Sequence, residues 1–137
     1  MAKRVRELYD DTFQEMLRGN ELVFVDFYAD WCGPCKAVAP VVERVAKEYG
    51  GRVVFGKLNT DGNPETATRY RISSIPALIL FRDGKPVTRL NGFQPEPALR
   101  ASLDRYAPPP EPVSVSSPPD EGEARGGLLS RLFGRRP

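Results

Sequence analysis

The two cysteines of the sequence lie three positions apart, in the segment Trp31-Cys32-Gly33-Pro34-Cys35-Lys36. Two thiols at this spacing can pass reversibly between dithiol and disulfide, provided that one of them is ionised and reachable. The first turn of a helix favours ionisation, because its unpaired amides and the positive end of its dipole stabilise a thiolate. We therefore expect Cys32 to be an exposed nucleophile at a helix start. Cys35 should be a more buried thiol, one turn behind, that resolves the mixed disulfide.

The residues around the cysteine pair fit the same chemistry. Gly33 leaves room for the backbone of a partner chain, and Pro34 suits the first turn of a helix and stiffens it. Asp26 interrupts the apolar run Leu22–Ala29, which predicts a strand buried on both faces. Burial should raise the pKa of this carboxyl, so that it can act as a general acid or base. The alternative is a hydrogen-bonded acid with a structural role.

Residue types that the sequence lacks narrow the choice of site. It contains no histidine, which excludes Ser-His and Cys-His nucleophile pairs and histidine-based metal sites. Two cysteines are too few for a disulfide-rich scaffold or for a four-cysteine zinc site within one chain. Half of a zinc site, completed by a second chain, is the alternative for the pair. We expect no metal and no cofactor, so an outside donor has to reduce the oxidised pair.

Alternating strand and helix patterns should position these residues. The run Leu22–Ala29 leads into a helical pattern over residues 32–49, and Pro40 should kink that helix without ending it. Asp83-Gly84 is a hairpin signal. Asn63 should cap the short helix expected directly after it, at residues 64–70. The pattern predicts an α/β fold, a mixed sheet with helices on both faces. Its helices are expected at residues 11–18, 32–49, 64–70 and 96–106, and its strands at residues 22–29, 52–58, 77–81 and 86–90.

The composition changes near Ala107, where a segment rich in proline begins. We predict a folded domain over residues 1–106, an extended, mobile linker rich in proline and acids over residues 107–127, and a short basic amphipathic segment over residues 128–137. Four side chains of the last segment would share one helical face: Leu128, Leu129, Leu132 and Phe133. This tail is either a disordered end or a docking element for a protein or a membrane surface, and we expect membrane association through no other part.

The charge balance and hydropathy exclude further classes of protein. Lys and Arg number 20 against 18 Asp and Glu, and a net charge of +2 argues against nucleic-acid binding through bulk positive charge. No apolar run approaches the roughly 18 residues that span a bilayer, and no apolar segment typical of a secretory signal follows the first residues. We expect a cytoplasmic monomer. In a reducing compartment a closely spaced cysteine pair is more often catalytic or metal-binding than structural.

Four separated motifs resemble the thioredoxin family, and the likeness covers about Val5–Tyr106. The motifs are FVDFYAD followed by WCGPCK, then KLNTDGNP, then SIPALILFRDGK, then NGF. The resemblance implies the thioredoxin fold, with a mixed five-stranded sheet, and a protein-disulfide reductase that acts in electron transport and redox homeostasis. It also implies disulfide-containing client proteins and a thioredoxin reductase as electron donor. Gly-Pro between the cysteines is typical of a reductant, and less so of an isomerase or an oxidant.

The same resemblance implies roles for single residues. Cys32 and Cys35 match the redox pair that forms the disulfide, with Cys32 as the attacking thiol. Asp26 matches a buried acid that relays a proton to or from Cys35, and Lys57 matches a lysine close to that acid. Client contacts are implied for Trp31, Gly33, Pro34, Ile75, Pro76 and Gly92, with a cis peptide bond before the second proline.

Some positions depart from the family pattern or allow another interpretation. Ser73-Ser74 stands where glycine is common, and Phe93 stands where a small residue is common, which leaves the range of partners open. Lys57 could be an ordinary surface lysine, Pro76 a trans turn proline, and Trp31 a residue that only packs the loop. A competing function is that of a binding module, which would use the groove around Trp31 and Pro76 without any redox step.

Overall fold

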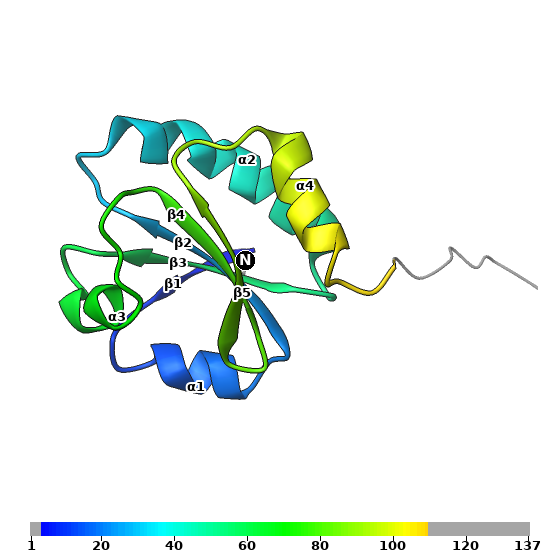
Figure 1. Cartoon of the computed structure of the whole chain (residues 1–137), viewed down its shortest axis with the longest axis horizontal. Coiled ribbons are helices and arrows are strands. Elements are labelled where there is room, and N and C mark those ends of the chain that lie inside the picture. The colour runs from blue at the N-terminus through cyan, green and yellow to red at the C-terminus, as the bar shows by residue number, and fades with distance from the viewer. Residues whose placement is uncertain (1–3, 110–137) are drawn as a thin grey trace, which may run out of the picture.

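A twisted five-stranded sheet forms the middle of the molecule, and helices cover both of its faces (Figure 1). The computed structural model describes residues 4–109. The strands are β1 (Val5–Leu8), β2 (Leu22–Tyr28), β3 (Val54–Asn59), β4 (Ala77–Arg82) and β5 (Lys85–Asn91). The helices are α1 (Phe13–Arg18), α2 (Gly33–Tyr49), α3 (Pro64–Arg69) and α4 (Glu96–Asp104).

The sheet is mixed, as the sequence predicts. Its strand order is β1-β3-β2-β4-β5. Strands β1, β3 and β2 run parallel, whereas β4 and β5 are antiparallel to their neighbours. Strand β2 therefore lies at the centre, and every residue from Leu22 to Phe27 is buried. This position explains the nearly continuous apolar run, because a central strand has no face towards solvent.

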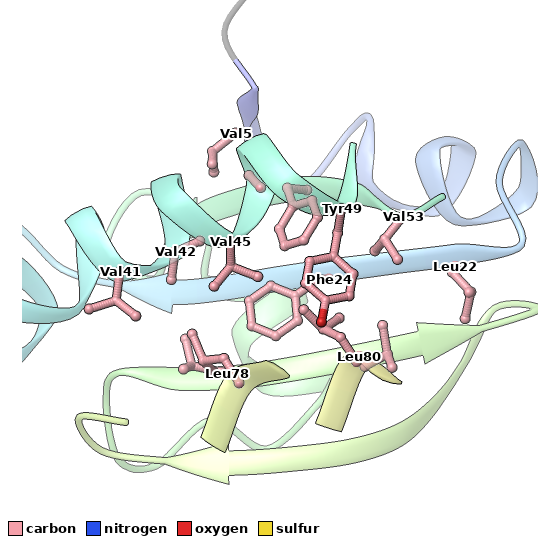
Figure 2. Close-up of a cluster of buried hydrophobic side chains, with 14 of the residues drawn as sticks. Val5, Leu22, Phe24, Val41, Val42, Val45, Tyr49, Val53, Leu78 and Leu80 are labelled. Atoms are coloured by element: carbon pink, nitrogen blue, oxygen red, sulfur yellow. The ribbon is translucent and has the colours of Figure 1, made fainter. Parts of the chain in front are cut away.

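The core has two layers, one on each face of the sheet. The first lies between the sheet and helices α2 and α4, where Phe24 of β2 and Leu80 of β4 pack beneath Val42 and Val45 of α2 (Figure 2). The second lies on the face of α1 and α3 and contains Phe13, Val23, Val25, Phe27, Leu58, Ile79 and Phe81. Alternate residues of β2 thus contribute to opposite layers. By this alternation Asp26 points towards α2, on the same face as Phe24.

Most predicted elements agree with the structure to within a few residues. Helix α2 continues through Pro40, and the hairpin turn falls at Asp83-Gly84, whose φ angles of 52° and 83° suit a tight two-residue turn. Strand β1 is not predicted by the residue pattern, although the family resemblance implies a fifth strand. Its two buried residues, Val5 and Leu8, are three positions apart and so do not alternate. From residue 110 onwards, the predicted linker and the segment 128–137 lie outside the described residues.

The prediction that the Asn63 side chain caps α3 is wrong, because another side chain binds the first amides of this helix. Asn63 occupies the capping position, but its side chain makes no capping bond. The Asp10 carboxylate caps this helix instead: it accepts hydrogen bonds from the backbone N–H groups of Thr66 (2.8 Å) and Glu65 (3.2 Å). The Asn63 amide oxygen in turn accepts from the Asp10 backbone N–H at 2.9 Å. A residue distant in sequence therefore takes the role, and local pattern alone does not reveal it.

Replacing Asp10 with alanine should destabilise the fold by about 1–2 kcal/mol, because two amides at the start of α3 lose their acceptor. Denaturant unfolding followed by circular dichroism measures this. Asp11→Ala is the matched control, since Asp11 is exposed and should change stability by less than about 0.5 kcal/mol. An equal loss in both variants would contradict the capping role of Asp10.

Candidate active site

The two cysteines lie where the central strand gives way to the longest helix. Cys32 is the N-cap residue of α2, and Cys35 lies in its first turn, with Pro34 between them. Their sulfurs form a disulfide, with the Cα atoms 5.2 Å apart. The backbone N–H of Cys35 donates to the Cys32 sulfur at 3.1 Å. The predicted placement at a helix start is therefore confirmed, and the Cys35 amide of the first turn faces the Cys32 sulfur.

The expected exposure of Cys32 is wrong for this disulfide form. Cys32 is 4% exposed and Cys35 3%, so burial does not distinguish the two residues. Both pack with Ala29, and the partly buried Tyr28 and Ile75 lie against them. The Cys32 sulfur also lies 3.8 Å from the Ile75 carbonyl oxygen. The exposed part of the site is its rim, formed by Trp31, Gly33 and Pro34.

The segment before β4 forms the opposite wall. The Ile75–Pro76 peptide bond is cis, which confirms the expectation for Pro76 and excludes the trans turn. Gly92 has a φ of 83°, a region that favours glycine, and its N–H donates to the Pro76 carbonyl at 2.7 Å. This bond ties the loop after β5 to the cis segment. A Cβ atom at Gly92 would meet no atom of residues 4–109 within 4 Å, so the space beside the Gly92 backbone is open there.

The indole of Trp31 projects from the rim. It is 69% exposed, and its N–H donates to the Asp61 carboxylate at 2.8 Å. Trp31 therefore does not serve to fill the loop interior. Asp61 follows β3, and sequence reasoning missed it because nothing in its local pattern indicates a partner thirty residues away. Ser73, Ser74 and Phe93 are also exposed, with Phe93 at 48%.

Asp26 is a buried acid next to the cysteine pair. It is 4% exposed, and its Oδ1 atom has no hydrogen-bond partner in the described part of the chain. A cavity of about 160 Å³ is lined by Asp26 together with Cys35 and Lys57. Burial raises the pKa of Asp26 to about 7, the positive charge of Lys57 opposes this, and the negative charge of Glu7 adds to it. The carboxyl can therefore exchange a proton near neutral pH.

Lys57 of β3 is the register partner of Asp26 on β2. It is partly buried and lines the same cavity, so it is not a freely solvated surface lysine. Its ammonium lies 5.6 Å from the centroid of the Tyr28 ring. The Tyr28 hydroxyl donates to the Glu7 carboxylate at 2.9 Å. Sequence reasoning missed Glu7 because β1 carries no recognisable pattern, and it missed Tyr28 because the partner of its hydroxyl lies on that strand.

The geometry brings together a redox-active sulfur pair, a helix start, an acid that titrates near pH 7 and a cis-proline wall. The family model named Thioredoxin matches residues 4–105. The chain belongs to the thioredoxin family. It is a thiol–disulfide oxidoreductase of the protein-disulfide reductase type, with Cys32 and Cys35 as its disulfide-forming pair. Thioredoxins exchange electrons with disulfide-containing client proteins and with thioredoxin reductases.

Thioredoxins from several organisms are similar to this chain. One from Alicyclobacillus acidocaldarius is 49% identical over 96 residues, which are 70% of this chain and 91% of that protein. One from Synechocystis sp. is 46% identical over 101 residues, which are 73% and 94% of the two chains. A chloroplastic M-type thioredoxin of Spinacia oleracea is 42% identical over 109 residues, which are 79% and 60% of the two chains. Within residues 4–109, no helix has the length and apolar character that crossing a membrane requires.

Asp26 should make the fold less stable as the pH rises. Its pKa is about 7 when folded and has the ordinary value of 3.8 when unfolded. The folded protein therefore keeps a proton that the unfolded chain releases, and stability falls between these two values by about 4 kcal/mol in total. Asp26→Ala should raise the free energy of unfolding at pH 8 by about 2–3 kcal/mol, since the small void left behind offsets part of the gain.

The gain from Asp26→Ala should turn into a small loss at pH 3.5, where the folded wild type and most of its unfolded chains are protonated, so that mainly the cost of the void remains. Thermal and denaturant unfolding at both pH values measure this difference. Asp30→Ala is the matched control, because Asp30 is exposed and should show little gain at either pH. A variant that is less stable than the wild type at pH 8 would show that the carboxyl is not penalised by burial.

Proposed function

We propose that Cys32 is the attacking thiol and Cys35 the resolving thiol in the reduction of protein disulfides. The observation that carries this assignment is the position of the Cys32 sulfur at the N-cap of α2, where it accepts the Cys35 N–H at 3.1 Å. In the reduced protein the same amide and the helix dipole would stabilise a thiolate on Cys32. Cys35 lies inside the first turn, and its sulfur receives no comparable hydrogen bond from residues 4–109.

The reaction then proceeds in two exchanges. The Cys32 thiolate attacks one sulfur of the client disulfide, that S–S bond breaks, and the other client sulfur leaves as a thiolate and takes up a proton. Cys35 next loses its proton and attacks the Cys32 sulfur of the mixed disulfide, which releases the second client sulfur. Two electrons pass to the client, which becomes a dithiol, and Cys32 and Cys35 become a disulfide.

We propose that Asp26 accepts the proton of Cys35 in the second exchange, and that Lys57 adjusts the proton affinity of Asp26. The support is the cavity that Asp26, Cys35 and Lys57 line together, and a pKa of Asp26 near 7 caused by burial. A base with this pKa suits work near neutral pH. Asp26 is unsuited to a purely structural role, because its Oδ1 atom accepts no hydrogen bond from the described residues.

We propose that a client segment docks across the rim of the site. The exposed Trp31, Gly33 and Pro34 would contact it from the side of α2. From the opposite wall, Ile75 would offer backbone groups, while Pro76 and Gly92 would shape the groove. The close approach of the Ile75 carbonyl to the Cys32 sulfur, at 3.8 Å, supports this arrangement. An extended client would then lie with its disulfide directly over Cys32.

For the cellular setting, we propose a cytoplasmic monomer that takes part in electron transport and is reduced by a thioredoxin reductase. The similarity to bacterial thioredoxins supports the donor. Both cysteines of the sequence belong to the redox pair, which leaves none for a structural disulfide and fits a reducing compartment. Among residues 4–109, large exposed apolar side chains are few, namely Tyr9, Trp31 and Phe93, which supports a monomer.

Substitution of single cysteines tests the two assigned roles. Cys35→Ser should form a stable mixed disulfide with an oxidised client such as insulin, because the resolving thiol is missing. Cys32→Ser should form none. Mass spectrometry after acid quenching measures the trapped adduct, and turbidity in a dithiothreitol-driven insulin assay measures turnover, which both variants should lose.

The double variant Cys32→Ser, Cys35→Ser is the control for adducts that do not involve the pair. Alkylation of the reduced wild type by iodoacetamide gives an independent readout, and Cys32 should react first at pH 7. Preferential alkylation of Cys35, or an adduct formed only by Cys32→Ser, would reverse the assignment of nucleophile and resolving thiol.

A further inference from the structure

Glu7, Lys57 and Tyr28 lie near Asp26 but do not take part in the thiol exchange itself. Glu7 on β1, Lys57 on β3 and Asp26 on β2 occupy one row across the parallel strands, because Glu7 is the register partner of Lys57, and Lys57 that of Asp26. Tyr28 lies two residues beyond Asp26 on the same face of β2. Lys57 therefore stands between two carboxyl groups, one on each neighbouring strand.

Tyr28 spans this row by two contacts. Its hydroxyl donates to both oxygens of the Glu7 carboxylate, at 2.9 and 3.1 Å, so that the side chain reaches from β2 to β1. The Lys57 ammonium lies 5.6 Å from the centroid of its ring, within the range of a cation–π contact. Within residues 4–109, Lys57 makes no ion pair shorter than 4.0 Å, with Asp26 or with Glu7.

We propose that Glu7 is a positioning residue of the active site, which anchors Tyr28 by its hydroxyl and shares the Lys57 ammonium with Asp26. This inference rests on the proposed role of Asp26 as the proton acceptor of Cys35. A lysine held by Asp26 alone would stabilise the carboxylate and weaken it as a base. A lysine shared with Glu7 stabilises it less, and Asp26 keeps its affinity for a proton up to neutral pH.

The charged groups around Asp26 support the sharing of Lys57 between Asp26 and Glu7. Lys57 faces it from β3, Cys35 and Lys36 from α2, and Asp30 from the loop after β2. On β4, the register partner of Asp26 is apolar, Leu78. The positive charge of Lys57 lowers the pKa of Asp26, and the negative charge of Glu7 raises it. The pKa of Tyr28 is raised by its burial and by Glu7, so its hydroxyl remains a donor over the working pH range.

Glu7→Gln tests the proposal because it removes the charge and keeps an oxygen that can accept from Tyr28. The ¹³C signal of the Asp26 carboxyl, followed by NMR from pH 4 to pH 10 in the oxidised protein, gives the midpoint of its titration directly. We expect this midpoint to fall by about 0.3–1.2 pH units, the effect of a unit charge about 10 Å away, two strand spacings, for a dielectric between that of bulk water and the effective value near a protein surface.

Glu15→Gln is the matched control. It makes the same chemical change at an exposed position of α1, on the opposite face of the sheet, and the midpoint should stay within about 0.1 pH unit of the wild type. An unchanged midpoint in Glu7→Gln, or an equal fall in Glu15→Gln, would overturn the proposal.

A double-mutant cycle tests whether Glu7 acts through Lys57. Lys57→Gln alone should raise the Asp26 midpoint, because it removes the positive charge. Adding Glu7→Gln to this variant should then lower the midpoint by less than half of the shift seen in the wild-type background, since there is no ammonium left to share. An equal shift in both backgrounds would show direct repulsion only and would overturn the sharing of Lys57.

Tyr28→Phe provides a second variant, for which the expected shift has the opposite sign. It keeps the ring against Lys57 but releases the Glu7 carboxylate, which can then turn towards the ammonium and compete for it more strongly. The Asp26 midpoint should therefore rise. A lower or unchanged midpoint would overturn the anchoring role of the hydroxyl.

Rates of client reduction separate this inference from the proposed function. The pH profile of the resolving step, measured by stopped flow with a pre-formed mixed disulfide, should move with the Asp26 midpoint in each variant. If the midpoint moves and the profile does not, the role of Asp26 as proton acceptor fails while the role of Glu7 stands. If the midpoint itself does not move in Glu7→Gln, the role of Glu7 fails whatever the rates are.

Discussion

The amides at the start of α2 determine where sulfur chemistry can take place in this molecule. The first turn of an α-helix carries N–H groups that have no partner within the helix. Because the chain passes directly from the buried strand β2 into α2, the residues between them lie next to these groups. Cys32 occupies the N-cap, where most helices have an oxygen, and its sulfur takes the place of that oxygen. The rest of the fold holds this junction in place. The two core layers fix β2 from both faces, and the valines of α2 fix the helix above it.

Much of this could be predicted from the sequence, because the relevant signals are local. The apolar run of β2, the helical period of α2 and the Asp83-Gly84 turn each specify their structure within a few residues. The cysteine spacing and the buried Asp26 identified the site for the same reason. Residues whose roles depend on distant partners could not be found in this way. Asp10 caps a helix more than fifty residues away, and Asp61 binds the indole of Trp31 across a loop.

The surroundings of Asp26 show a second limit of sequence reasoning. A lone acid in an apolar strand indicates a raised pKa, but the extent of the rise depends on which charges the sheet order brings near it. Strand β3 lies between β1 and β2, although it follows both in sequence, and only this order places Lys57 between two carboxyl groups. The predicted exposure of Cys32 was the other error, because the residue types around a cysteine do not reveal that Tyr28 and Ile75 pack against the cysteine pair.

The end of the described chain has a practical consequence for attaching the protein to something else. Pro108 accepts a hydrogen bond from Arg52 and lies near Leu22, where β2 begins and α2 has just ended, whereas Cys32 follows the other end of β2 (Figure 1). Because α2 is 17 residues long, its start at the cysteine pair and its end near Pro108 lie about 25 Å apart. A molecule tethered to a bead, an electrode or a fused cargo beyond residue 109 would thus be oriented with its sulfurs outward, and large clients could still approach them.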